Sequence, residues 1–330
     1  MDSQADLLIE IGTEELPPVA LPTLEKAFRD GFQGQLTANA IGFREIESFA
    51  SPRRLALLVR AVDCRKADQE TVRRGPAVQA AFGEDGQPTA AAAGFAKSCG
   101  VDVGALGREE TDKGSWLVFR SVRPGEETVL LVPAMAEAAL ASLPIPKRMR
   151  WGAGAEEFVR PVHWACVKLG RSAVEGRILG VEIRPCTRGH RFHHPQEIEI
   201  AAAEDYAERL RTVGHVEASV ERRRELVGQQ VSDLAASHGF RARIDQDLLN
   251  EVTALVEWPQ ALLCRFDARF LEIPAEVLIE TMQSNQKYFP LENAAGELQA
   301  EFIAVANIES QSPDRVRAGN ERVIRPRFED

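Results

Sequence analysis

The residues of this chain that are best suited to chemistry are arginines, lysines and amides gathered in short polar segments between apolar stretches. Six such segments occur in the 330 residues: SPRRL (51–55), PKRMRWG (146–152), FVRPVHW (158–164), TRGHRF (187–192), QSNQKYF (283–289) and GNERVIRPRFED (319–330). Arginine and lysine neutralise phosphates, amides hydrogen-bond base edges, and exposed rings stack on unpaired bases. The segments therefore predict contact with an RNA-like polyanion, whereas Trp164 and Phe289 are expected to pack in the core.

The charge distribution also indicates a localised anionic partner. A net charge of −10 argues against a general nucleic-acid-binding protein. Residues 147–194 nevertheless hold ten Lys and Arg against four Glu, residues 53–74 hold seven against three acids, and residues 315–327 hold five against one. Clustered cations on an acidic chain favour a directed partner, with solvated surface arginines as the alternative for any single cluster.

A metal site and a nucleotide site are the other chemistries to consider. Cys186, His190, His193 and His194 lie within nine residues. Structural zinc sites normally pair two short chelating steps across a longer loop, and the intervening arginines would repel a dication. We therefore expect this loop to contact phosphate or bases, or to be a structural turn with exposed histidines. Gly152-x-Gly154 lacks the preceding strand and the third glycine of a dinucleotide-binding turn.

Apolar periodicity predicts the elements that position these segments. It predicts a buried strand at 6–12, a helix over 21–42 and a strand over 54–62. Residues 203–240 form the longest helical region, with a break near Gly214. Alternating but unequal elements predict an α+β fold of mixed sheets and helices rather than a doubly wound sheet. No apolar run approaches the roughly 18 residues of a membrane span, and five dispersed cysteines fit reduced thiols in the cytoplasm.

The motifs, taken in order, resemble a known family. LLIEIGTEELPP, SPRRLA, PKRMRWG, FVRPVHW, TRGHRF, EVTALVEWP, IETMQSNQKYFPL and GNERVIRPRFED together resemble the β subunit of bacterial heterotetrameric (α2β2) glycyl-tRNA synthetase, from residue 6 to the last residue. The resemblance implies an accessory subunit of glycine–tRNA ligase whose partners are tRNA-Gly and the catalytic α subunit. ATP and Mg are then used by the α subunit, so no catalytic residue, cofactor or metal is expected in this chain.

The residue pattern and the resemblance together predict a domain arrangement. Residues 1–69 and 129–202 are expected to form a discontinuous mixed α/β module similar to the B3/B4 region of the phenylalanyl-tRNA synthetase β chain, with residues 70–128 as a small inserted helix/hairpin domain. Residues 203–240 form a helical segment, and residues 241–330 continue the mixed module toward an HD-type domain. Because members of the family are about twice as long, the chain is expected to be an N-terminal portion that lacks the HD-type and anticodon-binding domains.

The candidate tRNA-binding residues follow from the physical argument rather than from family assignments. They are the cations and amides of the matched segments: Arg53, Arg54, Lys147, Arg148, Arg150, Arg160, Arg188, His190, Arg191, Asn285, Gln286, Lys287, Arg322, Arg325 and Arg327. The alternative is a structural scaffold that docks the α subunit, with RNA bound only by the missing C-terminal part. An editing hydrolase, suggested by analogy with B3/B4, lacks a recognisable nucleophile or metal set in this sequence.

Overall fold

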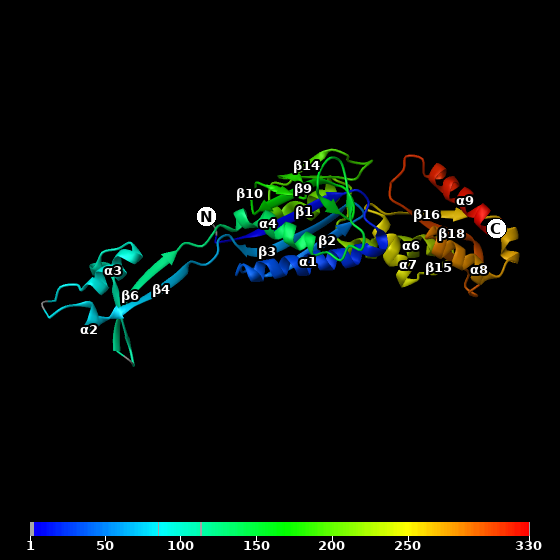
Figure 1. The fold of residues 1–330 in the computed structure, drawn as a ribbon. Coiled ribbons are helices and arrows are strands. Elements are labelled where there is room, and N and C mark those ends of the chain that lie inside the picture. Colours follow the sequence, from blue (N-terminus) through cyan, green and yellow to red (C-terminus); the bar gives the residue numbers. More distant parts are fainter. Residues whose placement is uncertain (1–2, 85, 113, 330) are drawn as a thin grey trace. The chain divides into compact units, whose positions relative to one another are not determined.

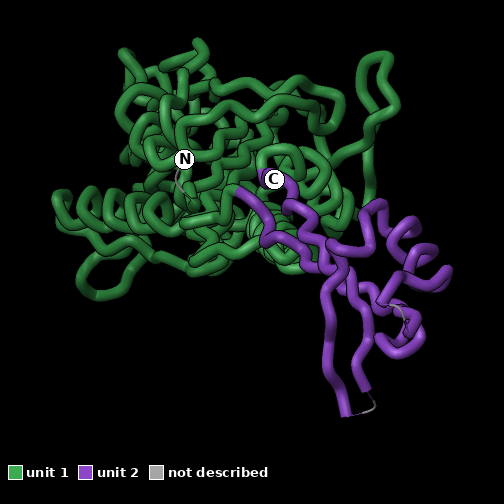
Figure 2. The backbone as a smooth tube through the Cα atoms, turned by 90° about the vertical axis from the view of Figure 1, so that its left-hand side faces the viewer, with its two compact units in different colours: residues 1–64, 129–330 green, residues 65–128 purple. Residues whose placement is uncertain are grey.

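The computed structural model describes residues 3–84, 86–112 and 114–329, and the chain divides into two compact units. Unit 1 comprises residues 1–64 and 129–330, and unit 2 comprises residues 65–128 (Figure 2). The sequence placed the insertion at 70–128. Unit 2 begins five residues earlier because Arg65 forms a β-bridge with Glu127 and the Lys66 amide donates to the Glu126 carbonyl at 2.9 Å.

The larger sheet of unit 1 has the strand order β11-β12-β9-β1-β3-β2, with β10 also paired to β9. Its central strand β1 (Gln4–Thr13) pairs antiparallel with β3 (Arg54–Asp63) on one side and β9 (Val162–Leu169) on the other. β12 (Val181–Arg184) runs parallel to β9. The mixture of directions confirms an α+β architecture. The other strands are β2 (Glu45–Ser51), β10 (Ser172–Ala173) and β11 (Arg177–Ile178).

Helices cover both faces of this sheet (Figure 1). Because side chains alternate along β1, Leu7, Ile9 and Ile11 lie in the core with α1 (Leu21–Ala38) and α4 (Thr128–Ala141). The opposite face packs Leu8 under η3 (Ala203–Asp205) and α5 (Tyr206–Thr212). Short elements complete this half: η1 (Pro18–Ala20), β7 (Met149–Arg150) with β8 (Glu157–Phe158), and β13 (Cys186–Arg188) with β14 (Glu197–Glu199).

The second sheet of unit 1 has the order β15-β17-β18-β16 and is antiparallel. Its strands are β15 (Arg241–Ala242), β16 (Gln260–Arg265), β17 (Phe289–Glu292) and β18 (Leu298–Ala306). One core joins it to α6 (Val220–Ser237) and α7 (Gln246–Leu255). The other core joins it to η4 (Ala268–Glu272), α8 (Ala275–Glu280), the π-helical turn η5 (Thr281–Asn285) and α9 (Pro313–Glu329).

The helical region at 203–240 therefore serves two different cores. α5 packs on the first sheet and α6 on the second, with the break at Gly214 that the sequence indicated. Residues 241–330 form their own antiparallel sheet rather than extending the first one, because β16, β17 and β18 pair with one another. The two predicted core rings, Trp164 and Phe289, are 6% and 0% exposed, which confirms that prediction.

Unit 2 is a small three-stranded sheet with the order β4-β6-β5. Its elements are β4 (Gln69–Ala77), α2 (Val78–Ala81), α3 (Ala90–Cys99), η2 (Val103–Ala105), β5 (Gly107–Thr111) and β6 (Gly114–Arg123). A core of Ala81, Ala92 and Leu117 holds the helices to the sheet. In the described part of the chain, no helix is long and apolar enough to span a membrane.

Candidate nucleic-acid interface

Four segments that are distant in sequence meet at one end of the first sheet. The Thr13 amide at the end of β1 donates to the Arg53 carbonyl at 2.8 Å, and the next amide, of Glu14, donates to the Pro161 carbonyl at 2.9 Å. The Arg191 guanidinium reaches back to the Glu14 carboxylate at 2.7 Å. The basic segments 51–55, 158–164 and 187–192 are thereby brought to the same place, as a polyanion-binding face requires.

Trp164 lies at the centre of this meeting point. The guanidinium carbons of Arg53, Arg54 and Arg188 lie 5.5, 5.6 and 5.6 Å from the centre of its ring, within the range of a cation–π contact. The ring lies flat against the backbone of Gly12, where an added Cβ would be 1.8 Å from a ring carbon. Glycine is therefore required at that position of β1. We call Arg53 and Arg188, together with Arg160 and Arg191 of the adjoining basic segments, the Trp164 cluster.

Arg54 is not part of the exposed surface, and its expected role as an RNA contact is revised. Its side chain is 0% exposed and lies 3.0 Å from the Glu10 carboxylate and 3.2 Å from the Glu257 carboxylate. It also donates to the Arg188 carbonyl at 3.0 Å. Burial opposes its charge, but the two carboxylates outweigh burial and raise the Arg54 pKa above its usual value. A phosphate cannot reach this guanidinium. Arg54 instead contacts the Trp164 ring and the Arg188 carbonyl from the interior of the protein.

The carboxylate of Glu10 is enclosed by further donors. It accepts hydrogen bonds from Trp164 Nε1 at 2.5 Å, Thr187 Oγ1 at 2.6 Å and the Tyr206 hydroxyl at 2.5 Å. Burial beside this carboxylate raises the pKa of Tyr206 well above its ordinary value, so the phenol remains protonated as a donor. The network fixes the orientation of the Trp164 ring and of the strand that leads to Arg188. Because none of its groups is exposed, the network affects the site only by positioning Trp164 and Arg188.

Glu257 extends the network to the second sheet. Its carboxylate accepts from Ser51 Oγ at 2.5 Å, and its amide donates to Asn307 Oδ1 at 2.7 Å. Burial raises the Glu257 pKa, but Arg54 and Ser51 outweigh burial and hold it below the usual value. Fully buried Arg223 on α6 reinforces the junction by donating to the Ala50 carbonyl at 2.7 Å. The hydrogen bonds of Glu257 and Arg223 thus connect the basic end of the first sheet to the second sheet.

The arginines of the cluster, of which Arg53, Arg160 and Arg188 are half-buried and Arg191 is exposed, differ in how far neighbouring groups neutralise them. Arg53 is half-buried, forms no ion pair within 4.0 Å among the described residues, and has a pKa lowered mainly by burial. Arg160 donates to the carbonyl oxygens of Glu15 and Val159, which are uncharged partners. The Arg188 guanidinium lies 3.9 Å from the Glu197 carboxylate. These three can accept an anion as a further partner.

Arg191 is the neutralised member of the cluster. Its hydrogen bond lowers the pKa of Glu14 despite the opposing effect of burial, with His163 at 3.1 Å as a second donor to the same carboxylate. A second acid, Glu15, lies 3.9 Å from its guanidinium. An RNA phosphate would have to compete with two acids for this side chain, so we expect Arg191 to contribute less than its neighbours.

His190 is also removed from the exposed set. It is 1% exposed, its Nε2 lies 2.8 Å from the Asn307 carbonyl oxygen, and its Nδ1 accepts the amides of Phe192 and His193. These partners place the proton on Nε2. His193 Nε2 in turn accepts the Glu309 amide at 3.0 Å. The histidines of this loop thus tie it to the segment before α9, and the described residues contain no group of three or more His, Cys, Asp or Glu able to hold a metal.

The segment at 147–150 forms a separate hairpin. Lys147 is exposed, and Arg148 donates to the Ala141 carbonyl at 2.9 Å, which caps the C-terminal end of α4. Arg150 is exposed with the Glu157 carboxylate at 3.7 Å. Arg148 therefore has a structural use that the sequence did not reveal, whereas Lys147 is exposed and Arg150 would share its charge between Glu157 and an added anion.

The remaining candidates belong to the second sheet. The ammonium of Lys287 is already neutralised, because it forms an ion pair with Glu251 at 2.9 Å. The backbone of Lys287 has a positive φ of 60°. Asn285 is exposed and Gln286 half-buried at the end of the π-helical turn. Arg322, Arg325 and Arg327 are exposed on α9. The polar strip QSNQK is thus a tight connection between α8 and β17, of which Asn285 is the most accessible candidate.

The sequence did not single out the residues that organise the site, Glu10, Glu257 and Tyr206. One signal was present for Glu10, because an acid in the middle of the apolar strand LLIEIG requires a buried partner. Glu257 offered no such signal. Its partner Arg54 lies more than 200 positions away and had been assigned to the surface.

Comparison with known proteins places this fold in a family. Residues 7–330 match the family described as glycyl-tRNA synthetase beta subunit. The chain is 51% identical over 325 residues to the glycine–tRNA ligase beta subunit of Hahella chejuensis and 50% identical over 324 residues to that of Chromohalobacter salexigens. The subunit of Marinobacter nauticus is 48% identical over 326 residues. Each match covers 98% of this chain and 47% of the relative, so the chain spans about half the length of these relatives.

Proposed function

The chain belongs to the glycyl-tRNA synthetase beta-subunit family, and from this premise we propose that it binds tRNA-Gly through the Trp164 cluster as an accessory part of glycine–tRNA ligase. On this proposal the α subunit, which uses ATP and Mg, performs adenylation and transfer in the cytoplasm. The first sheet of unit 1, as a module like B3/B4 of the phenylalanyl-tRNA synthetase β chain, supplies the rigid support for the RNA contact.

The observation that carries the proposal is that Arg53 and Arg188 lie over one tryptophan ring, with Arg160 on an adjoining basic segment. Planar guanidinium groups match the oxygen pairs of a phosphate, and here Trp164 holds two of them over its ring. Arg53 and Arg160 have no carboxylate partner within 4.0 Å in the described part of the chain. A protein with a net charge of −10 attracts RNA only where cations are concentrated, and this end of the sheet is such a place.

The test is the salt dependence of tRNA-Gly binding. Filter-binding titrations at several salt concentrations compare the unchanged chain with Arg53→Ala/Arg188→Ala. For each phosphate that the variant no longer neutralises, the magnitude of the slope of log K against log salt is expected to fall by about 0.7 to 0.9. The control is Lys26→Ala/Arg29→Ala, which removes the same charge from α1, where both cations pair with Asp30. Equal slopes for the two double variants would refute the assignment of the cluster to RNA.

A scaffold that docks the α subunit is the second candidate, and one observation favours it. Phe192, beside the cluster, is 70% exposed, and exposed aromatic rings are common anchors of protein interfaces. If the cluster meets the α subunit, Arg53→Ala/Arg188→Ala weakens the association of the two subunits and leaves tRNA binding unchanged. Measuring both affinities on the same variants separates the two functions.

A further inference from the structure

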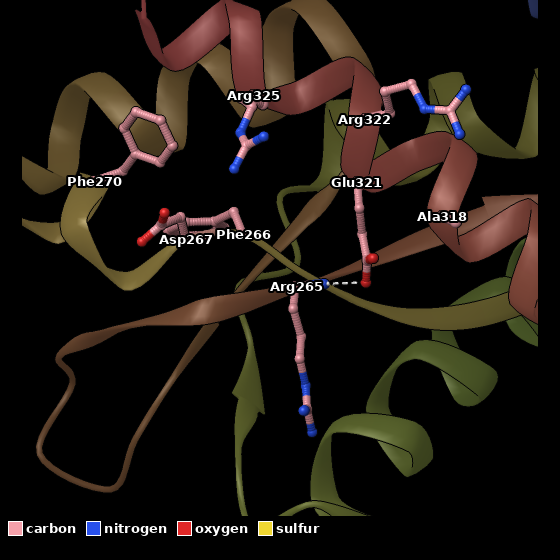
Figure 3. Close-up of a pocket in the computed structure, with 8 residues that line it drawn as sticks. All are labelled: Arg265, Phe266, Asp267, Phe270, Ala318, Glu321, Arg322 and Arg325. Atoms are coloured by element: carbon pink, nitrogen blue, oxygen red, sulfur yellow. Dashed lines mark hydrogen bonds between the residues drawn. The ribbon is translucent and has the colours of Figure 1, made fainter.

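A second basic groove lies on the other sheet, between α9 and the segment 265–270 (Figure 3). Its volume is about 350 Å³. The groove is lined by Arg265, Phe266, Asp267, Phe270, Ala318, Glu321, Arg322 and Arg325. None of these residues belongs to the Trp164 cluster, so the groove is a separate feature that the proposed function has not used.

The arginines of α9 form a stripe along one side of the helix. Arg315, Ala318, Arg322 and Arg325 follow one another at intervals of three or four residues, which places them on one side. Buried Ile324 and Phe328 anchor the opposite side to the core. At about 1.5 Å per residue the stripe is about 15 Å long, and the small residue between its arginines lets a ligand approach the helix closely.

The acids of the groove are engaged with protein donors, whereas the arginines of the stripe are not. Glu321 accepts the Arg265 amide at 2.9 Å, and Asp267 accepts the Arg269 amide at 3.1 Å. By contrast, the side chains of Arg322 and Arg325 have no hydrogen-bond or ion-pair partner within the described ranges. Figure 3 shows Arg325 extending from α9 toward the segment that carries Asp267 and Phe270. Backbone amides leave the charges of Glu321 and Asp267 in place, so the lining carries three arginines against two acids, and Arg322 and Arg325 are the cations available to an anion.

The aromatic rings of the groove are committed to the core. Phe270 is 7% exposed and lies edge-on to Phe328 at 5.5 Å, and Phe266 meets the same ring at 5.1 Å. Phe270 is therefore not free to stack on a base, and half-buried Phe266 is held against Phe328. What remains for a ligand is the guanidinium groups of Arg322 and Arg325, which extend from α9 in different directions (Figure 3) and suit phosphates better than a protein surface.

We propose that the α9 groove holds the phosphate backbone of an RNA without reading its sequence, as a second contact independent of the Trp164 cluster. The inference rests on the proposed function, because it takes the same kind of ligand. It adds that RNA contacts both sheets of unit 1. It also requires that the contribution of this groove be the same for cognate and non-cognate RNA, since phosphates carry no base identity.

The experiment uses Arg322→Ala/Arg325→Ala with two probes, tRNA-Gly and a tRNA for another amino acid. We expect affinity for both to fall by the same factor, about 2- to 30-fold, as the loss of two exposed charge pairs implies. The salt slope is expected to become shallower by about 1.4 to 1.8. The charge-matched control is again Lys26→Ala/Arg29→Ala. Circular dichroism and the thermal midpoint check that α9 still packs.

The outcomes separate the groove from the function it rests on. If the unchanged chain binds RNA and Arg53→Ala/Arg188→Ala weakens it, but the α9 variant behaves like the control, the groove assignment is wrong and the proposed function stands. If the unchanged chain binds no RNA, both are wrong. If the α9 variant loses affinity for the α subunit rather than for RNA, the groove docks protein and the inference is overturned. A loss confined to tRNA-Gly would likewise contradict sequence-independent binding.

Discussion

The buried position of Arg54 leads to a strong prediction about stability. Arg54→Ala would leave the carboxylates of Glu10 and Glu257, which are 0% and 1% exposed, without the cation between them. Glu10 would keep its hydrogen bonds from three neutral donors, and Glu257 would keep the one from Ser51. Both charges would nevertheless remain in a medium from which water is excluded, and the space of the guanidinium would be empty.

The expected loss is large on the scale of protein stability. Removing one partner of a buried ion pair costs about 3 to 5 kcal/mol, because the other charge is left uncompensated. With a urea dependence of about 3 kcal/mol per molar, this loss lowers the unfolding midpoint by about 1 to 1.7 M. Near-UV circular dichroism and tryptophan fluorescence follow the transition, since Trp164 lies against the altered side chain.

The loss is also expected to depend on pH with a definite sign. In the unchanged chain burial raises the pKa of Glu257, but Arg54 outweighs burial and holds it below the unfolded value of about 4.3. The ionised carboxylate therefore stabilises the fold above that pH, and this contribution is lost as the pH falls through the folded pKa. In Arg54→Ala the largest effect that opposes burial is gone and only weaker effects, such as those of Ser51 and Arg53, remain, so the ionised Glu257 destabilises the fold at neutral pH. The difference in the free energy of unfolding between the variant and the unchanged chain should therefore become smaller as the pH falls toward 4.

The control removes the charges together. In Arg54→Met/Glu10→Gln/Glu257→Gln neither carboxylate is left ionised beside the missing cation, and buried Arg223 keeps its carbonyl acceptors, so we expect the triple variant to recover most of the stability lost by Arg54→Ala. A cost of less than about 1 kcal/mol for Arg54→Ala at neutral pH, the upper range for exposed ion pairs, would contradict this prediction. A triple variant less stable than Arg54→Ala would also contradict it, because the network would then be stabilising through packing rather than charge.

Three further predictions concern single positions. Gly12→Ala would place a methyl group 1.8 Å from the Trp164 ring, so we expect a loss of about 1 to 3 kcal/mol, measured by thermal unfolding, together with altered tryptophan fluorescence. Burial raises the pKa of the Cys166 thiol well above its usual value and that of Cys264 to about 12, so neither should react with a disulfide reagent at pH 8 until the chain unfolds. Arg148→Ala removes the donor to the last carbonyls of α4 and should cost about 0.5 to 1.5 kcal/mol in urea unfolding, whereas an equal cost for exposed Arg150→Ala would contradict the capping role.

The sequence predicted the elements whose pattern is local. The apolar run at 6–12 is the central strand β1, the run at 54–62 is β3, and the helical spacing from residue 21 is α1, which ends at Ala38 rather than at residue 42. Periodicity succeeds here because the spacing of apolar residues along a short segment shows whether one face or both faces of the element are buried. It could not say that the chain after 240 builds a second sheet, since strand pairing is a property of distant segments.

The candidate site was predictable only in part for the same reason. Arg53 and Arg54 are adjacent and chemically alike, yet Arg53 is half-buried at the surface and Arg54 is enclosed. The difference is made by Glu10 and Glu257, which approach from other strands and loops. His190 shows the same limit, because its partner Asn307 lies 117 positions away. Residue type indicated the chemistry of the segments, and only the fold distinguishes a structural cation from an exposed one.

The central claim is that the Trp164 cluster faces RNA. Phe192, which is 70% exposed beside Arg191, offers the most direct measurement. A photoreactive phenylalanine analogue incorporated at this position is irradiated in the presence of tRNA-Gly and the α subunit together. We expect a covalent adduct between the chain and tRNA-Gly that high salt abolishes. A cross-link to the α subunit, with no RNA adduct at any salt concentration, would contradict the account.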